Sequence, residues 1–360
     1  MGELSQVSES VSGPRRITDV LPDHMLSIEW TASQGWLTPR ITPYQNLSLD
    51  PATCVFHYAF EAFEGMKAYK CPTDNTLRLF RPEKNMARLN KSVARIALPT
   101  FDGAAFTKLI GEFAKLDQRF IPSEKGYSLY LRPTMIGTQR TLGVGPSGSA
   151  LLYVIASPVG PYYPTGFKAI SLEATDYAVR AWPGGVGDKK LGANYAPCIV
   201  PQLNAAKKGL HQNLWLFGEE EFITEVGTMN LFVALKDKET GQNELVTAPL
   251  DGTILEGVTR DSVLALARER MAKDGWKISE RYLTMQQLAD AQNEGRLIEV
   301  FGAGTAAIVA PIRKILWKDR MIDCGLKETE EAGKVAMQMK NWIEAIQYGE
   351  DPHEWSVKID

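Results

Sequence analysis

Hydrophobic positions recur at helical spacing in several stretches of the chain. Pro82 suits a first helical position, and Met86, Leu89, Val93 and Ile96 follow it three or four residues apart. The same kind of pattern predicts further helices over 106–116, from Gly257 to a stop at Gly275, from the capping-box residues Thr284 and Gln287 to Gly295, and over 329–348.

Short apolar runs between these helices predict strands over 127–132, 150–157, 214–217, 231–235, 276–283 and 297–301. The run ALLYVIAS at 150–157 is apolar enough to predict a strand buried on both faces. Three prolines and two glycines within 158–166 predict a linker. We therefore expect an α+β chain with a small domain over 1–158, a linker over 159–170, a large domain over 171–360, and a small-molecule site in the cleft between the domains.

Composition narrows the classes of protein that fit. The 360 residues are 44% hydrophobic and 23% charged with a net charge of −3, which predicts a soluble globular protein without a partner among nucleic acids or membranes. Its four cysteines form no C-x-x-C, and its four histidines form no cluster. We therefore expect no metal and no disulfide, a polar start that is no secretory signal, and a cytoplasmic location, with the mitochondrion as the alternative.

The stretch most suggestive of chemistry is GGVGDKKLGANY at 184–195. A lysine amine attacks carbonyl groups when its surroundings lower its pKa, and glycines let another molecule approach the backbone closely. Lys190 is therefore a candidate nucleophile. Taken alone, a lysine in a glycine-rich turn more often belongs to a solvated surface loop.

Two further stretches strengthen the case for Lys190. Gly257, Val258 and Thr259 stand at a predicted helix start, where free amides favour a phosphate, and the turn at 302–306 offers amides and a hydroxyl. Glu225 supplies a carboxylate of the kind that faces a pyridine nitrogen, although it also fits a solvated loop. Together these features indicate a phosphorylated aldehyde cofactor.

The main rival interpretation is a dinucleotide fingerprint, because GAGTAA at 302–307 fits G-x-G-x-x-A after a strand. Pro311 follows too soon for the helix that such a fold requires, and fewer than about 60 residues remain to complete it. We therefore reject a nicotinamide oxidoreductase.

Seven stretches in a fixed order resemble one family: HYAFEAFEGMKAY (57–69), FRPEKNMARL (80–89), SLYLRP (128–133), KLGANY (190–195), TEVGTMN (224–230), LEGVTR (255–260) and VFGAGTA (300–306). The chain resembles the branched-chain amino acid aminotransferases of the eukaryotic type, which are fold-type IV pyridoxal-phosphate enzymes. The resemblance extends from about Asp23 to Trp355. It implies a transferase that exchanges amino groups between L-leucine, L-isoleucine or L-valine and 2-oxoglutarate.

The resemblance also implies roles for individual residues toward pyridoxal 5'-phosphate. Lys190 would hold the cofactor as a Schiff base and transfer protons, and Glu225 would face the ring nitrogen. Tyr195 would bond the ring oxygen, and Arg88 would bind the phosphate, although by itself Arg88 fits a solvated arginine on an amphipathic helix. The remaining implied cofactor contacts are Thr228, Leu255, Gly257, Val258, Thr259, Gly304 and Thr305.

For the substrate, the resemblance implies an apolar pocket that involves Tyr58, Phe63, Val144, Tyr162 and Thr228. The α-carboxylate would meet Tyr58 and the amides of Thr305 and Ala306. Tyr130 and Arg132 would lie at the pocket mouth, where Arg132 accepts the second carboxylate of glutamate. Because the turn that contains Val144 reaches a neighbouring subunit's site in the family, a homodimer is implied.

The sequence departs from the family at three positions. Ala307 and Ala310 replace a C-x-x-C pair of mammalian mitochondrial members, and Glu256 replaces a frequent proline, so we expect its side chain to point away from the phosphate. The nearest alternatives within the same fold are a D-amino acid aminotransferase, an (R)-selective amine transaminase and an aminodeoxychorismate lyase. A non-catalytic binding protein is a third class, in which Lys190 would be replaceable.

Overall fold

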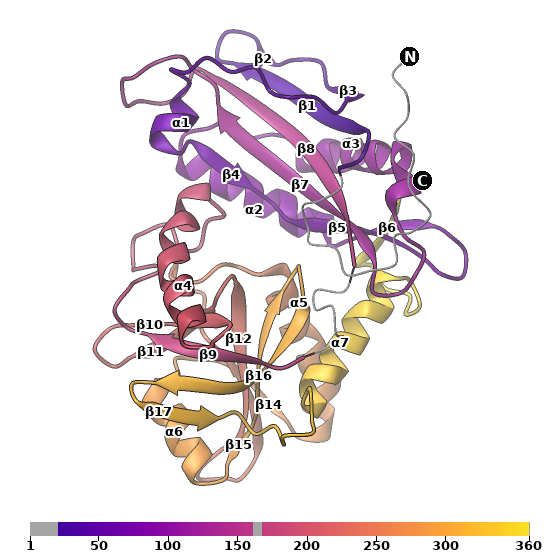
Figure 1. The fold of residues 1–360 in the computed structure, drawn as a ribbon. Coiled ribbons are helices and arrows are strands. Elements are labelled where there is room, and N and C mark those ends of the chain that lie inside the picture. Colours follow the sequence, from indigo (N-terminus) through magenta and orange to yellow (C-terminus); the bar gives the residue numbers. More distant parts are fainter. Residues whose placement is uncertain (1–20, 161–167, 360) are drawn as a thin grey trace. The chain divides into compact units, whose positions relative to one another are not determined.

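The computed structural model describes residues 21–160 and 168–359. The chain divides into two compact units, each with its own sheet (Figure 1). Unit 1 comprises Met1–Pro164, Lys189–Ala193 and Ala345–Asp360, and unit 2 comprises Thr165–Asp188 and Asn194–Glu344. Two short segments beyond the predicted linker therefore pack with unit 1, and one of them contains Lys190.

Unit 1 is built on a nine-stranded antiparallel sheet. Its strands are β1 (His24–Thr31), β2 (Gly35–Trp36), β3 (Arg40–Pro43), β4 (Glu61–Phe63), β5 (Met66–Lys70), β6 (Leu77–Phe80), β7 (Ser128–Gly137), β8 (Ser149–Val159) and β18 (Ser356–Ile359). The main order is β18-β6-β5-β7-β8-β1-β2, with β3 beside β1 and β4 beside β7. The last described strand, β18, thus forms an edge of the first sheet.

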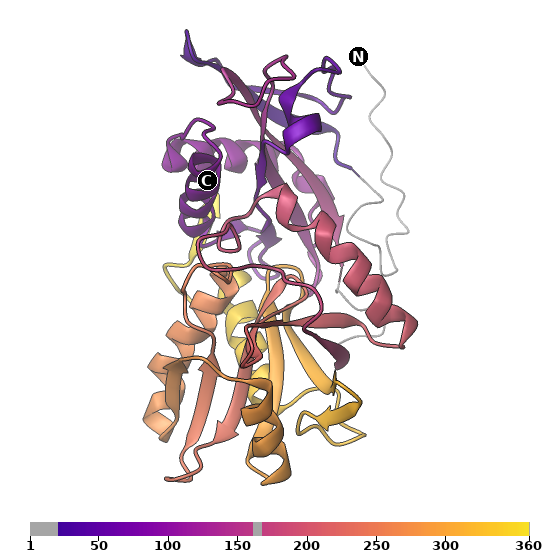
Figure 2. The same ribbon diagram turned by 90° about the vertical axis from the view of Figure 1, so that its left-hand side faces the viewer.

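Helices α2 (Pro82–Arg95) and α3 (Gly103–Leu116) pack on each other and on β4 and β1, and in Figure 2 they lie to one side of the strands. Both were expected from the apolar periodicity, although α2 ends one residue before Ile96. The short helix α1 (Cys54–Tyr58) and the turn η1 (Gln118–Phe120) complete the described helical part of unit 1. In α2 the buried stripe holds Asn85, Arg88 and Ser92 as well as apolar side chains.

The prediction that 150–157 is buried on both faces is wrong. In β8 buried residues alternate with half-buried ones, so that Leu152 and Val154 lie in the core while Leu151 and Tyr153 do not. The strand pairs antiparallel with β7 and β1, and the helices α2 and α3 pack on one side of this sheet. An apolar strand composition did not distinguish the two faces.

Unit 2 contains a second nine-stranded sheet with mixed pairing. Its strands are β9 (Ile170–Thr175), β10 (Gln212–Phe217), β11 (Phe222–Val226), β12 (Met229–Lys236), β13 (Asn243–Thr247), β14 (Lys277–Glu280), β15 (Leu297–Gly304), β16 (Ile308–Trp317) and β17 (Arg320–Asp323). Because β11 pairs with both β10 and β12, the path β11-β10-β9-β16-β15-β12 closes on itself like a barrel. This closure puts Glu225 of β11 opposite Asn230 of β12.

The structure describes four helices in unit 2, of which the last three follow the predicted pattern with shifted ends and the first was not predicted. They are α4 (Ile199–Lys207), α5 (Val258–Leu266), α6 (Met285–Asn293) and α7 (Lys334–Gln347), which continues into the last segment of unit 1. After α5 the chain forms a π turn and a 3-10 turn up to Gly275, whose φ of 81° ends the helical stretch. The Thr284–Gln287 capping box is present on α6. Strand β16 follows β15 directly, where a dinucleotide fold would have a helix, and this supports its rejection.

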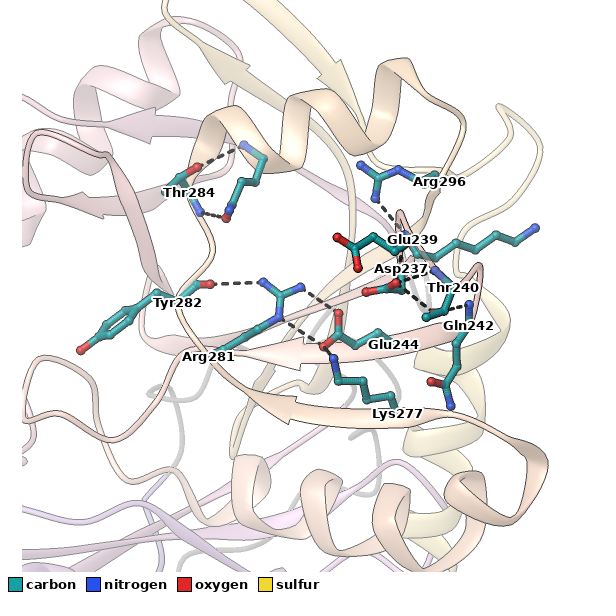
Figure 3. A network of polar contacts seen from close by, with 12 residues as sticks. Asp237, Glu239, Thr240, Gln242, Glu244, Lys277, Arg281, Tyr282, Thr284 and Arg296 are labelled. Carbon is teal, nitrogen blue, oxygen red and sulfur yellow. Dashed lines mark hydrogen bonds and ion pairs between the residues drawn. The ribbon is translucent and has the colours of Figure 1, made fainter.

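A polar network surrounds Glu244 of β13, which lies next to the edge strand β14 of unit 2 (Figure 3). Arg281 donates from Nε to Glu244 Oε1 at 3.2 Å and from Nη2 to Oε2 at 2.8 Å. The Lys277 Nζ lies 3.2 Å from Oε1. Burial opposes the charge of Glu244, but the hydrogen bonds from Arg281, Ser279 and Lys277 outweigh it and lower the pKa of the carboxyl group. The network thus ties β13 to β14 by a charged side chain that is 1% exposed.

Within residues 21–160 and 168–359, no helix is long and apolar enough to cross a membrane. The predicted linker 159–170 includes 161–167, which lie outside the described residues, and the predicted domain limits stay a prediction.

Candidate active site

Lys190 is held on unit 1 by backbone pairing with β4. Its carbonyl accepts from the Phe63 amide at 3.1 Å, and its own amide donates to the Ser92 hydroxyl at 2.9 Å. Leu191 forms a bridge with Ala62. The Lys190 Nζ lies 4.8 Å from the centre of the Phe63 ring, which is 9% exposed. The lysine therefore has a fixed backbone and an aromatic neighbour, unlike a lysine in a solvated surface loop.

Arg88 is buried on α2 and belongs to a charged hydrogen-bonded set. It donates from Nε to Glu64 Oε1 at 2.7 Å and from Nη2 to Glu64 Oε2 at 2.8 Å. Asn85 and the Gly65 amide also donate to Glu64, which is fully buried. This bidentate pairing fixes the plane of the guanidinium, so the alternative of a solvated arginine is wrong.

The predicted substrate residues of unit 1 fall into two groups. Phe63 of β4 lies beside Arg132 of β7, whose guanidinium carbon is 4.6 Å from the ring centre, and Arg132 Nη2 donates to the Tyr130 hydroxyl at 3.0 Å. Tyr58 and Val144 are exposed, and the Tyr58 hydroxyl donates to the Leu142 carbonyl. Tyr162 lies outside the described residues.

In unit 2, Glu225 is 2% exposed and held by several donors, so the alternative of a solvated loop acid is wrong. Its Oε1 accepts from the Asn230 side chain at 3.0 Å and from the Leu255 amide at 3.1 Å. Arg180 Nε lies 2.9 Å from Oε2. These contacts favour a charged carboxylate in a buried place, because each one places positive charge or an N–H group near its oxygens.

Asn230 joins Glu225 to the predicted phosphate turn. Its side chain donates to the Leu255 carbonyl at 3.0 Å, and a Cβ at Gly257 would lie 2.1 Å from its oxygen, so a side chain at Gly257 would displace it. Helix α5 begins directly after Gly257, which has no side chain to cap it. The amides of Val258 and Thr259 thus stand at a helix start of the kind that binds phosphate.

The other predicted residues of unit 2 lie near Asn230 in the sheet or at its ends. Ala303 pairs with Asn230, which places Gly304, Thr305 and Ala306 beside the start of β12. Thr228 occupies the turn between β11 and β12. Tyr195 is half-buried and precedes the turn η3 (Ala196–Cys198).

Sequence reasoning missed Glu64 in unit 1, which contacts Arg88, and Arg180 and Asn230 in unit 2, which contact Glu225. Asn85, Arg88 and Ser92 at helical spacing, beside the apolar stripe of α2, signalled a buried polar partner such as Glu64. Asn230 stood inside a matched stretch, two residues after Thr228. Nothing in the sequence around Arg180 distinguished it from other arginines.

The donor set of each unit fits pyridoxal 5'-phosphate. Unit 1 offers an amine at Lys190 and an oriented guanidinium at Arg88, while unit 2 offers a buried carboxylate at Glu225 and uncapped amides at α5. Amine, carboxylate and phosphate donors are what an aldehyde, a pyridine nitrogen and a phosphate require. The individual roles toward the cofactor and the substrate stay predictions.

Comparison with known proteins identifies the class. Residues 61–315 match the family described as amino-transferase class IV, and the chain belongs to this family. It is 62% identical over 327 residues to the mitochondrial branched-chain-amino-acid aminotransferase of Saccharomyces cerevisiae, covering 91% of this chain and 83% of that protein. It is 61% identical to the cytosolic one, covering 93% and 89%. Within class IV the chain is therefore a member of the branched-chain-amino-acid aminotransferases.

Solved structures agree with this fold. The branched-chain amino acid aminotransferase of Escherichia coli matches with a TM-score of 0.74 at 22% identity, covering 94% of this chain and all of that one. The enzyme of the same name from Thermobaculum terrenum, solved in its PLP form, matches with a TM-score of 0.74 at 20% identity, covering 95% of this chain and all of that one. The predicted α+β fold of type IV, the pyridoxal-phosphate cofactor and the transferase class are confirmed.

Proposed function

We propose that the protein moves amino groups between L-leucine, L-isoleucine or L-valine and 2-oxoglutarate in two half-reactions. The observation that carries this proposal is the placement of Lys190 on unit 1, where its Nζ faces Phe63 and Phe63 contacts Arg132. One aromatic ring thus adjoins both the amine that a transaminase needs and a cation suited to a dicarboxylate. The names of the relatives from Saccharomyces cerevisiae support the same substrates.

The residues of the two units have separate tasks in this proposal. Bound pyridoxal 5'-phosphate supplies an aldehyde and an electron-accepting ring. Lys190 accepts a proton at its Nζ from the carbon that bears the amino group and later returns one, a contribution of roughly 10² to 10⁴ in rate. Glu225, paired with Arg180 and held by two N–H donors, would face the ring nitrogen.

The phosphate is bound by Arg88, the amides of Val258 and Thr259, and Thr305. Glu64 keeps the Arg88 guanidinium in one plane, so its charge is already oriented before the anion arrives. Tyr195 donates to the ring oxygen, and Leu255, Gly257, Thr228 and Gly304 shape the surrounding turns.

The substrate side is formed by Phe63, Tyr58, Val144, Tyr162 and Thr228 in this proposal. The α-carboxylate meets Tyr58 and the amides of Thr305 and Ala306. Arg132, supported by Tyr130, accepts the second carboxylate when glutamate or 2-oxoglutarate takes the place of leucine. An arginine suits that task because its charge persists and its donors are forked.

We also propose a homodimer in the cytoplasm. Val144 is 79% exposed, and helix α4 exposes Ile199, Val200 and Leu203. Large apolar side chains exposed together on one helix favour a protein partner. The four separate cysteines suit a reducing compartment, although the relatives include both cytosolic and mitochondrial proteins.

The first test is an absorbance spectrum of the purified holoenzyme before and after addition of L-leucine, then after 2-oxoglutarate. We expect the visible band of the bound cofactor to shift with leucine and to recover with the oxo acid. Lys190→Ala should abolish the leucine response, whereas the neighbouring Lys189→Ala should keep it. A band that responds to D-alanine or an (R)-amine and not to leucine would replace the proposal with one of the other fold-type IV activities.

A further inference from the structure

Glu61 lies on the same side of β4 as Phe63, next to the segment Lys189–Ala193 that contains Lys190. A Cβ at Gly192 would lie 2.2 Å from Glu61 Oε2 and 3.0 Å from its carboxyl carbon. The carboxylate therefore rests directly on the backbone two residues after Lys190. A side chain at Gly192 would have to displace the Glu61 carboxylate.

Arg132 is a cation on the same face of the sheet as Glu61. In the pairing of β4 with β7, Phe63 stands opposite Thr134 and Glu61 opposite Ile136, so Arg132 follows on the same face at the next alternate position. Burial raises the pKa of Glu61, and the attraction of Arg132 partly opposes this rise. The charge of Arg132 thus acts on the Glu61 carboxyl group, yet among the described residues no ion pair joins the two side chains.

Arg132 also has unused binding capacity. Its Nη2 donates to the Tyr130 hydroxyl, while its Nε is buried and has no hydrogen-bond partner among the described residues. A buried N–H group without an acceptor is costly, so this guanidinium is suited to bind an anionic oxygen. Phe63 covers one side of it.

We propose that Glu61 determines substrate specificity by setting how strongly Arg132 attracts a second carboxylate. The proposal rests on the proposed transamination and adds a residue to its substrate site. When an aliphatic side chain is bound, Glu61 balances the half-buried charge of Arg132. When a dicarboxylate is bound, Glu61 repels it and limits its affinity, so that leucine and glutamate can alternate in one site.

The test is Glu61→Gln, which keeps the size of the side chain and removes its charge. Two charges several ångströms apart near a protein surface interact strongly enough to change affinity about three- to tenfold. We expect the KM for 2-oxoglutarate and L-glutamate to fall by that factor, with kcat unchanged within about twofold. The KM for L-leucine should stay within about twofold.

Calorimetry on the holoenzyme gives a readout that is independent of turnover. Glutarate should bind Glu61→Gln about three- to tenfold more tightly than wild type, and 4-methylpentanoate should bind both equally. In the Arg132→Gln background, Glu61→Gln should no longer improve glutarate binding, because the charge that Glu61 opposes is gone. The exposed Glu112→Gln on α3 is the control for a general change in charge.

The outcomes separate this inference from the proposed function. If wild type transaminates leucine and Glu61→Gln leaves glutarate binding unchanged, or shifts both acids alike, the specificity role is wrong. A glutarate effect that persists without Arg132 would also overturn it. If wild type does not transaminate leucine with 2-oxoglutarate, the proposed function fails, while the glutarate comparison still reports on the Glu61–Arg132 pair.

Discussion

Glu64 has no proposed contact with the cofactor or the substrate, yet it is a fully buried acidic residue paired with Arg88. Its two oxygens accept hydrogen bonds from Arg88 twice, from Asn85 and from the Gly65 amide. A carboxylate with so many donors is stable in a buried place, and it holds the guanidinium in one orientation. Arg88 is therefore a phosphate-binding candidate whose geometry is set by another residue.

Glu64→Gln should lower both stability and cofactor affinity. The buried guanidinium of Arg88 loses its counter-ion, which should reduce the free energy of unfolding by about 3 kcal/mol in urea titrations. Equilibrium dialysis should show pyridoxal 5'-phosphate binding about tenfold more weakly, since Arg88 is no longer held in place.

The control for Glu64→Gln is Glu83→Gln, which removes the same charge from an exposed position on α2. It should change neither quantity by more than roughly half a kcal/mol. An unchanged cofactor affinity in Glu64→Gln would show that Arg88 does not need this partner to bind the phosphate.

At the scale of residues, the sequence revealed candidates but not their partners. Lys190, Glu225 and Arg88 could be named because their stretches match a family, and the structure places each in a defined environment. Arg180 could not be named, since its importance depends on which strand faces it. Pairings between residues far apart in the chain, as between Arg180 and Glu225, leave no local pattern.

Two buried glutamates connect secondary-structure elements of unit 2, and their surroundings shift their pKa values in opposite directions. Glu244 of β13 is paired with Arg281 and Lys277, and its pKa is lowered. Glu299 of β15 accepts hydrogen bonds from backbone amides at the start of α7, from Val335 at 2.5 Å and Ala336 at 3.2 Å. Burial raises its pKa more than these amides lower it.

This difference predicts opposite pH dependences for two identical substitutions. A raised pKa in the folded state means that the stabilising contribution of Glu299 is present at low pH and lost as the pH rises through that pKa. Glu299→Gln should therefore become more stable relative to wild type as the pH rises from acid to neutrality. A lowered pKa means that Glu244 stabilises above its unfolded pKa and ceases to do so in acid.

Urea unfolding at several pH values from about 4 to about 8 measures both effects. Glu244→Gln should be less stable than wild type by about 2 kcal/mol near neutrality, and this deficit should shrink as the pH falls. Parallel pH profiles for the two variants would contradict the opposite environments of the two carboxylates.

Helices and turns were easier to predict than the faces of strands. The capping box at Thr284 and the glycine stop at Gly275 are local signals, and both appear where they were expected. The helix predicted over 329–348 begins only at Lys334, because its first turn is set by Glu299 from a distant strand. Which side of β8 is buried depends equally on distant partners, namely the helices that cover one face of the sheet.

For the molecule as a whole, helix α4 is the clearest candidate for a subunit contact. Ile199, Val200 and Leu203 are each more than half exposed, at spacings that put them on one side of the helix. Three large apolar side chains on one exposed helix are unusual for a monomer.

Leu203→Glu should shift the proposed dimer toward monomer, because a charge would be buried in the contact. Sedimentation or light scattering at micromolar concentration measures the mass. Met321→Glu, which also replaces an exposed apolar side chain of unit 2, should remain dimeric. A wild-type monomer, or an unchanged mass for Leu203→Glu, would exclude α4 from the contact.

The path of the chain through unit 1 has a consequence for protein synthesis. Strand β18 pairs with β6 from Ser356 to Ile359, and the segment Lys189–Ala193 bridges to β4 through Leu191. While the ribosome is still translating the second half, the first sheet lacks an edge strand and the lysine segment. Unit 1 can therefore be completed only after Ile359 has left the ribosome, and a nascent chain arrested before Lys189 should stay sensitive to protease.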